Sequence, residues 1–315
     1  FGAVAAGNCV VLKPSAYAPN TSRAMAELIA AVFNPDWVTV IEGGREQNAA
    51  LLEQRFDYIF FTGSVDVGKM VMEKASRHLT PVTLELGGKS PCIVDETANI
   101  KLAARRIVFG KYLNLGQTCV APDYIYVHTS VKDKLIHEVI QEIKRQYQDL
   151  SSYGKIINEK HFDRISKLLD PNKIVYGGKT NRETLKIEPT IMDHVSWDDA
   201  VMQEEIFGPI MPILTFTNFE DCINIIKEKP SPLALYLFSS NKTRADMVTH
   251  SVPYGGGCIN DTIIHLATSN MPFGGVGNSG MGGYHGKEGF KTFTHYKSIV
   301  DKKTWLDLPI RYQPY

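Results

Sequence analysis

The sequence predicts an α/β fold of two domains, each a largely parallel sheet covered by helices. Short apolar runs alternate with segments of helical periodicity through residues 1–85, and the alternation returns between residues 98 and 250. Strands that alternate with helices are typical of parallel sheets with crossover helices. A chain of 315 residues, 43% hydrophobic and 22% charged, has the composition of a globular protein with about two domains.

The first set of elements ends close to Glu85. Met25, Leu28 and Val32 recur at helical spacing and predict a helix over residues 21–33, capped by Asn20 or Thr21. The other elements predicted here are strands at 9–12, 37–41, 58–61 and 82–84 and helices at 47–54 and 66–77.

The second set begins after Glu85, without a low-complexity linker or an internal repeat. An amphipathic pattern predicts a helix over 98–112, and Leu135, Val139 and Ile143 predict a long one over 131–147. A histidine on a later helix, His161, is expected to be a surface polar residue. The remaining predicted elements are strands at 125–128, 173–176, 211–216, 234–238 and 293–301 and helices at 161–169, 219–227 and 243–250.

Charge and cysteine content argue against several classes of protein. Lys+Arg and Asp+Glu number 34 each, and no basic run is present, so we expect no nucleic-acid partner. No apolar stretch is long enough to span a bilayer, and no signal peptide is expected. The five cysteines are scattered and odd in number, which fits a reducing compartment and predicts a cytoplasmic location. No cysteine or histidine spacing predicts a metal site.

Cys119 is the candidate nucleophile. A free cysteine is most often a small buried hydrophobe, but Gly116 allows close approach of the backbone to a ligand and Pro122 stiffens the exit from the loop. Upstream, a Gly-Gly pair follows Glu85 and its neighbour, which predicts a tight turn that carries this carboxylate into a cleft. A nucleophile and a possible base on separate loops form a hypothesis of covalent catalysis.

A candidate cofactor site contains Gly63, Ser64, Val67 and Gly68, where a predicted strand passes into a helix. A helix N-terminus offers free N–H groups and a positive dipole to an anion. The spacing differs from G-x-G-x-x-G, and a plain strand-to-helix turn explains these residues equally well. Lys13 ends another predicted strand, where ligands of open α/β sheets gather, although a solvated edge lysine is the alternative.

Six motifs, in this order along the chain, resemble those of the aldehyde dehydrogenase superfamily. They are Val-Val-Leu-Lys-Pro-Ser at 10–15, Phe-Thr-Gly-Ser at 61–64, Glu-Leu-Gly-Gly-Lys-Ser-Pro at 85–91, Gly-Gln-Thr-Cys at 116–119, Glu-Glu-Ile-Phe-Gly-Pro at 204–209 and Pro-Phe-Gly-Gly-Val-Gly-Asn-Ser-Gly at 272–280. Cys-Val-Ala-Pro-Asp-Tyr at 119–124 and Gly-Met-Gly-Gly-Tyr-His-Gly at 280–286 resemble the class 3 branch in particular.

The resemblance implies a Rossmann-like parallel sheet that binds NAD or NADP over residues 1–85 and a catalytic domain over 86–287. Residues 288–315 are then expected to return to the cofactor side and to carry an oligomerisation strand, so a homodimer is the expected assembly. The chain opens without an initiator methionine, and the resemblance implies that it is a fragment. An upstream segment on the order of 100 residues, with an asparagine that helps bind the oxyanion, would be missing from the cofactor domain.

The resemblance also assigns roles. Cys119 would attack an aldehyde to form a thiohemiacetal and then a thioester, and Glu85 would activate the water that releases the acid. Lys13 would bond the adenosine ribose, and the turn at 63–68 would hold the dinucleotide. Glu205 would bond the nicotinamide ribose with Phe207 packed beside it, while Glu205 is also a second candidate base. Without the resemblance, these last two are a loop carboxylate and a core phenylalanine.

Two further expectations concern specificity. Many relatives carry a glutamate where this chain has Ala16, so tolerance of NADP beside NAD is expected. Tyr284 and His285 lie in the late glycine-rich run and are candidates for substrate contact. The identity of the aldehyde is left open.

Two rival functions remain at this stage. An enzyme of the same fold that transfers the acyl group to coenzyme A typically replaces the base glutamate, so Glu85 argues against it. A non-catalytic dinucleotide-binding module would have no need of Cys119, Glu85 and Glu205 together. A fragment without turnover, which retains only dinucleotide binding or a structural role, stays an alternative.

Overall fold

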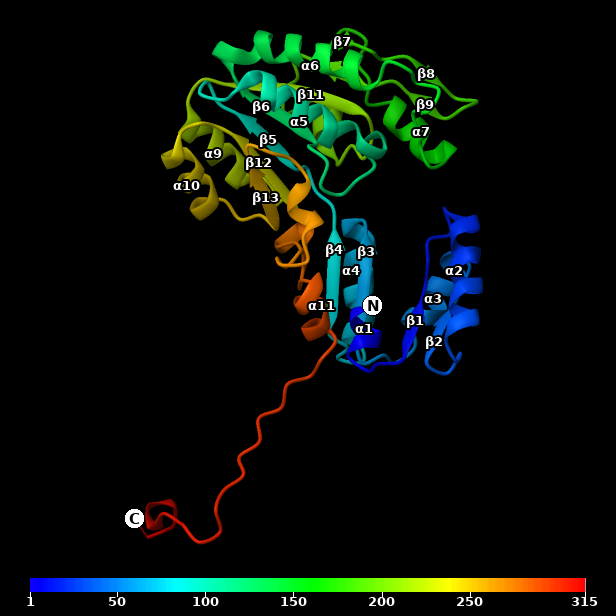
Figure 1. Cartoon of the computed structure of the whole chain (residues 1–315), viewed down its shortest axis with the longest axis vertical. Helices are drawn as coiled ribbons and strands as arrows, with labels where there is room; N and C mark the ends of the chain where they lie inside the picture. Colours follow the sequence, from blue (N-terminus) through cyan, green and yellow to red (C-terminus); the bar gives the residue numbers. More distant parts are fainter. Residues whose placement is uncertain (315) are drawn as a thin grey trace.

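The structure is a computed structural model that describes residues 1–314, so Tyr315, the last residue of the predicted C-terminal part, lies outside it. Two α/β parts stand one above the other in Figure 1, and an extended C-terminal segment leads away from the smaller part. Among the described residues, no helix combines the length and apolar character that a bilayer crossing requires.

A seven-stranded sheet forms the larger part, and its strands are parallel except β7, which pairs antiparallel with β10. In spatial order they are β13 (Gly256–Ile259), β12 (Ala234–Phe238), β5 (Pro91–Val94), β6 (Tyr124–His128), β11 (Ile210–Phe216), β10 (Thr190–Met192) and β7 (Ile174–Tyr176). The strands β5, β10 and β13 are absent from the sequence prediction.

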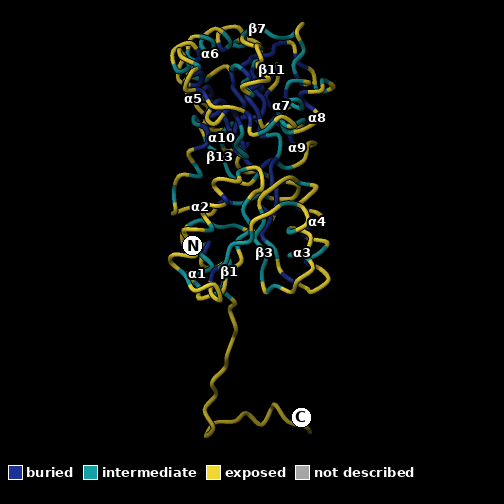
Figure 2. Tube along the Cα trace, turned by 90° about the vertical axis from the view of Figure 1, so that its right-hand side faces the viewer, coloured by how far each residue is buried: buried dark blue, intermediate teal, exposed yellow. Residues whose placement is uncertain are grey.

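Helices cover both faces of this sheet because its strands are apolar on both sides. Cys92 and Val94 of β5 pack with α5 (Ile100–Tyr112) and α6 (Lys132–Gln146), while Ile93 joins the opposite core. That second core includes α7 (Glu159–Ser166), α9 (Phe219–Glu228) and α10 (Lys242–Ser251). The short elements α8 (Ala200–Gln203), β8 (Thr180–Asn181) and β9 (Lys186–Ile187) complete this part, whose core is the darkest region of Figure 2.

The smaller part contains a two-stranded and a three-stranded sheet. In the first, β1 (Val10–Leu12) lies parallel to β2 (Val38–Val40), with α2 (Pro19–Val32) and α3 (Arg45–Leu52) beside them. In the second, β4 (Val82–Leu86) lies between β3 (Ile59–Gly63) and the antiparallel β14 (Gly280–Met281), with α4 (Val65–Ser76) packed on β3 and β4.

The predicted start of the first long helix is wrong. The helix α2 begins at Pro19 with Ala18 as its N-cap, not at Asn20 or Thr21. Proline is favoured at the first helical position because its missing N–H would have no partner there, and its fixed φ suits the helix.

The chain returns to the smaller part near its end. The helix α11 (Gly286–Thr292) packs against α1 (Gly2–Ala5), and the Phe293 ring lies 5.4 Å from Tyr58. Beyond it, residues 294–303 form neither helix nor strand, so the strand predicted over 293–301 is absent from the single chain. A strand needs a hydrogen-bonded neighbour, and none lies beside this segment within residues 1–314. The chain then ends with the short turn η5 (Pro309–Arg311).

The connection from β4 to β5 sets how the two parts meet. Only residues 87–90 separate these strands, so the carboxyl end of β4 faces the amino end of β5. The strand β3 is parallel to β4, and β6 and β11 are parallel to β5 and follow it in the sheet. The carboxyl edge of one sheet therefore meets the amino edge of the other, and the loops at both edges share one region.

Candidate active site

The predicted catalytic residues converge at this junction of the two sheets. Glu85 lies in β4, Cys119 precedes β6 and Glu205 precedes β11. The charges of Glu85 and Glu205 both raise the pKa of Cys119, so the three groups lie within electrostatic reach of one another. In open α/β sheets ligands usually gather at the carboxyl ends of strands. Here that rule holds for the smaller part, whereas the larger sheet contributes its amino ends.

Glu85 lies within a strand, not in the turn that the Gly-Gly pair predicted. It is the fourth residue of β4, opposite Thr62 of β3 and Gly280 of β14. The residue is 2% exposed, and neither carboxylate oxygen has a hydrogen-bond partner among residues 1–314. Burial raises the pKa of Glu85 to about 8. The site therefore holds a carboxyl group that can accept a proton near neutral pH, as a general base must.

Gly280 permits the strand pairing that encloses Glu85. Its φ is +134°, and a Cβ at this position would collide with the carbonyl of Leu84. Only glycine adopts this conformation readily at such a close backbone approach. The last glycine of the motif at 272–280 is therefore required for the pairing of β14 with β4.

Cys119 is half-buried in the loop before β6. Burial is the main cause that raises its pKa to about 11, followed by the charges of Glu85 and Glu205, while the N–H groups of Cys119 and Val120 act in the opposite direction. The thiol is thus protonated at neutral pH in this state. Since the thiolate is the nucleophile, Cys119 needs a proton acceptor or a positive charge in the cleft before it can react.

Glu205 and Phe207 lie on the turn before β11. The Glu205 carboxylate packs so closely on Gly87 that any side chain there would collide with it. Burial and the charge of Asp123 raise the pKa of Glu205 to about 8. Phe207 is 40% exposed with a φ of +49°, so it is not a core phenylalanine. A bulky residue in left-handed backbone is strained, and such strain concentrates at functional sites.

An ion pair between Lys89 and Asp123 joins the loops of the site. The sequence motifs did not predict it. The Lys89 ammonium donates to Asp123 Oδ2 at 2.5 Å and to the carbonyl oxygens of Val201 and Glu204 at 2.9 Å each. Asp123 Oδ1 accepts the backbone N–H of Ile206 at 2.9 Å. This pair fixes the Glu85, Cys119 and Glu205 segments relative to one another. In the sequence, this ion pair could be anticipated only from a lysine and an aspartate that lie in two separate motifs.

We expect Lys89→Met to destabilise the protein strongly. Asp123 is 4% exposed, and loss of its partner leaves a buried carboxylate without a direct counter-ion, a change that costs about 3–5 kcal/mol. Urea unfolding of the variant measures this loss. The control Lys291→Met removes an exposed pair with Glu288 and should change the unfolding midpoint little. Equal stability of the two variants would exclude the scaffold role of Lys89.

The predicted cofactor residues lie at the carboxyl ends of β1 and β3. Lys13 directly follows β1, and its ammonium donates to the carbonyl of Pro14 at 2.6 Å. Ser64 is the N-cap of α4 without a side-chain capping bond, and Gly63 and Val67 are exposed. Gly68 differs, because it is buried and a Cβ there would lie 2.6 Å from Leu86 Cδ2. Gly68 therefore permits the packing of α4 on β4, and its role in cofactor binding stays a prediction.

The remaining residues of this set suit a dinucleotide. The helix α4 presents exposed first-turn positions at its N-terminus, where backbone N–H groups favour an anion such as a phosphate. Lys13 supplies a cation that can bond hydroxyls, and the exposed Phe207 ring offers an apolar face for a flat ring. The chemistry of these groups fits the cofactor that the sequence predicts.

An aromatic cluster lines the region beside Glu85. The Tyr284 ring lies 4.9 Å from Phe60 and 5.6 Å from Phe273, and His285 stacks on Phe273 at 5.2 Å. Besides burial, the charges of Glu85 and Cys119 raise the pKa of Tyr284. The Tyr284 phenol therefore lies within electrostatic reach of the two candidate catalytic groups. His161, expected at the surface, is instead half-buried, and its ring contacts Tyr17 at 5.8 Å.

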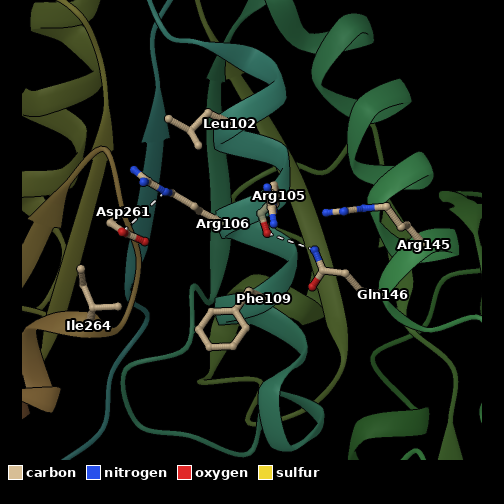
Figure 3. A pocket seen from close by; sticks show the side chains of 8 residues that line it. All are labelled: Leu102, Arg105, Arg106, Phe109, Arg145, Gln146, Asp261 and Ile264. Carbon is tan, nitrogen blue, oxygen red and sulfur yellow. Dashed lines mark hydrogen bonds and ion pairs between the residues drawn. The ribbon is translucent and has the colours of Figure 1, made fainter.

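A cavity of about 590 Å³ between α5 and α6 contains none of the predicted site residues. Figure 3 shows the Arg106 side chain directed at Asp261, and Arg145 pairs with Glu142 at 2.6 Å. Two of its three arginines are thus engaged by carboxylates. The cavity is lined by Leu102, Arg105, Arg106, Phe109, Arg145, Gln146, Asp261 and Ile264.

Within residues 1–314, no group of three His, Cys, Asp or Glu side chains could hold a metal ion.

Comparison with known proteins adds to this geometry. The aldehyde dehydrogenase family model matches residues 1–299. Over its whole length the chain is 52% identical to 4,4'-diaponeurosporen-aldehyde dehydrogenase of Staphylococcus aureus (strain NCTC 8325 / PS 47), of which it covers 70%. It is 47% identical to aldehyde dehydrogenase family 3 member A2 of Rattus norvegicus, over 96% of this chain and 63% of that protein.

The fold agrees with the same comparison. A solved substrate-bound state of Staphylococcus aureus AldH superposes with a TM-score of 0.97 and 51% identity, covering 100% of this chain and 70% of that one. The chain thus spans 63–70% of the length of these relatives. An NAD or NADP cofactor fits the family, since similar solved structures include an NAD⁺ complex and an NADP-dependent enzyme.

Proposed function

Because this chain belongs to the aldehyde dehydrogenase family, we propose that the protein oxidises an aldehyde to the carboxylic acid with NAD or NADP. Cys119 is the nucleophile and Glu85 the general base. The observation that carries this proposal is the meeting of the two groups from different sheets, where the charge of one raises the pKa of the other. The buried Glu85 carboxyl group has no hydrogen-bond partner, which lowers the stability of the fold. A role in catalysis explains why such a destabilising group is present.

The first step forms a bond between Cys119 Sγ and the aldehyde carbon. The thiol proton leaves to a base, and the carbonyl oxygen becomes an oxyanion, which the backbone N–H of Cys119 would stabilise. The resulting thiohemiacetal then loses a hydride from its carbon, and a thioester on Cys119 remains. NAD or NADP, when bound, would supply the hydride acceptor.

The second half of the reaction regenerates the enzyme. Glu85 takes a proton from water, and the oxygen of that water attacks the thioester carbon. The C–S bond breaks, the carboxylic acid leaves, and Cys119 recovers its sulfur anion. Lys13, Gly63, Ser64 and Val67 would hold the dinucleotide, with Glu205 on its nicotinamide ribose and Phe207 beside the ring.

Formation of reduced nicotinamide with a panel of aliphatic and aromatic aldehydes tests the proposed activity. We expect turnover with wild-type protein and an initial burst followed by slow turnover in Glu85→Gln, because the thioester would then accumulate. A steady-state rate in Glu85→Gln equal to that of wild type would remove Glu85 from the base role. The assay also identifies the preferred aldehyde.

We expect NADP to be accepted beside NAD. Ala16 stands where a carboxylate would repel a 2′-phosphate, so the discrimination between the cofactors should be small. Comparison of kcat/KM for the two cofactors measures it. A preference for NAD above about a thousandfold, near 4 kcal/mol, would contradict this expectation.

A second candidate function is dinucleotide binding without turnover. It is favoured by one observation, that burial and the charges of Glu85 and Glu205 raise the pKa of Cys119 to about 11, so the thiol is protonated at neutral pH. Binding of NAD or NADP without oxidation of any aldehyde in the panel would support it. Transfer of the acyl group to coenzyme A is disfavoured, because Glu85 is present and buried beside Cys119.

We further propose a cytoplasmic homodimer. The five cysteines are all free, as a reducing compartment allows. Among the described residues, 1–314, the segment 293–301 has no strand partner, and pairing with a second subunit would complete the predicted oligomerisation strand. Sedimentation of the purified protein before and after removal of residues 293–315 tests the assembly.

A further inference from the structure

One buried hydroxyl beside the site has no part in the chemistry above. Tyr236 is the middle residue of β12 and is 0% exposed. Phe238, two positions later on the same strand, belongs to the same apolar core and has no hydroxyl. A hydroxyl buried in such a core costs free energy unless it forms a hydrogen bond. The Tyr236 hydroxyl therefore needs a partner that the phenylalanine does not need.

That partner is the peptide group that follows the candidate nucleophile. The Tyr236 hydroxyl donates to the Val120 carbonyl oxygen at 2.6 Å, across 116 positions of the sequence. Val120 is itself 0% exposed, so bulk water does not reach this carbonyl in place of the hydroxyl. A strand of the larger sheet thus holds the Cys119 loop from outside it.

A line of hydrogen bonds leads from this contact to Cys119. The Val120 carbonyl and the Ala121 N–H belong to one peptide group, and that N–H donates to the Thr118 carbonyl oxygen at 3.0 Å. The Thr118 carbonyl in turn shares its peptide group with the Cys119 N–H. Hydrogen bonds in such a chain polarise one another. The Tyr236 hydroxyl is therefore linked, through two peptide groups, to the N–H that would stabilise the oxyanion.

The tyrosine can only be the donor of this bond, because a carbonyl oxygen accepts and never donates. Burial raises the pKa of Tyr236 well above its usual value, and an ionised Cys119 raises it further. The hydroxyl therefore stays protonated, and the bond to Val120 persists, when Cys119 loses its proton.

The beginning of the loop is tied separately. Gln117 Oε1 accepts the N–H of Ile157 at 3.0 Å, and Gln117 Nε2 donates to the Lys155 carbonyl at 3.2 Å. These contacts lie before Thr118, so they do not orient the peptide group that follows Cys119. The exit of the turn 118–121 is held by Tyr236.

We propose that Tyr236 is a positioning residue whose hydroxyl fixes the turn 118–121 and so keeps the Cys119 N–H directed at the oxyanion of the first step. The role rests on the proposed function, in which that oxyanion forms on the aldehyde. The same N–H also favours the anion of Cys119 Sγ, so the turn affects the reactivity of the free thiol as well. Tyr236 acts only through the backbone of this turn.

Tyr236→Phe removes the hydroxyl and keeps the ring. We expect the rate of reduced-nicotinamide formation in a single turnover to fall about ten- to hundredfold, because loss of a whole oxyanion donor costs about 10²–10³. The KM for the dinucleotide should stay within about twofold, since the lost interaction acts in the transition state. Alkylation of Cys119 by iodoacetamide at pH 8, followed on its peptide by mass spectrometry, should slow about three- to tenfold.

The matched control is Tyr112→Phe. Tyr112 is 1% exposed, and its hydroxyl donates to the carbonyl of Thr190 in β10 at 3.1 Å, away from the turn 118–121. Each variant removes one buried hydrogen bond, so the two should lose stability alike, and only Tyr236→Phe should slow both reactions of Cys119. Equal single-turnover rates in the two variants, or an alkylation rate in Tyr236→Phe equal to that of wild type, overturns the proposal.

Hydrogen exchange of the Ala121 amide tests the line of bonds in the wild-type protein without any variant. We expect this amide to be protected, and exchange as fast as that of an exposed loop overturns the proposal. Alkylation and hydrogen exchange need no turnover, so failure of the proposed function is seen separately in the aldehyde assay.

Discussion

Glu85→Gln is expected to be more stable than wild type, by an amount that grows with pH. The folded-state pKa of Glu85 is raised from 4.5 to about 8 by burial, so its neutral form is the one that the fold accommodates. The relative stability that this group gives is complete below its unfolded pKa and is lost as pH rises toward 8. Glutamine stays neutral throughout. Between pH 5 and pH 8 the advantage of the variant should grow by about 3 kcal/mol.

Urea unfolding of both proteins at pH 5 and pH 8 measures this difference. Glu96→Gln is the control of opposite sign, because its hydrogen bond with Arg244 lowers the pKa of Glu96 to about 2. That variant should lose stability, most clearly above the unfolded pKa. A constant difference between Glu85→Gln and wild type across this pH range would mean that Glu85 is not held in an unsolvated site.

Cys119→Ala is expected to abolish aldehyde oxidation, with a loss of at least about ten-thousandfold in kcat/KM. The proposed reaction begins with a bond to Cys119 Sγ, and no other thiol lies in the same loop. Loss of a covalent nucleophile removes the step that later residues serve, so the remaining groups cannot compensate. Turnover with a good aldehyde substrate measures the loss, and dinucleotide binding should persist.

The control for this variant is Cys9→Ala. Cys9 is an exposed free thiol that precedes β1, so its removal should leave turnover unchanged. Residual oxidation by Cys119→Ala within tenfold of wild type would show that hydride transfer proceeds without a thiohemiacetal at this residue.

The sequence predicted the parallel α/β class and most helices because apolar periodicity is a local property. It did not predict β5, since Pro91 and Cys92 directly after a glycine turn do not resemble a strand. Its parallel pairing with β6 and β12 comes from residues far along the chain. For the same reason the strand expected over 293–301 is absent, because a strand exists only where another strand lies beside it.

The site was predicted in part. Glu85, Cys119 and Glu205 were found through their motifs, but the strand position of Glu85 depends on β14, which arrives from residue 280. Gly68 was assigned to the cofactor from its motif; the motif did not show that Gly68 is buried where a Cβ would collide with Leu86.

The most direct test of the central claim is mass spectrometry of Glu85→Gln after brief exposure to an aldehyde and NAD or NADP. The proposed mechanism predicts a mass increase equal to the acyl group on the peptide that contains Cys119, lost again in the double variant with Cys119→Ala. An unmodified Cys119 peptide in a protein that has reduced its nicotinamide, or an acyl group on any other residue, would contradict the mechanism.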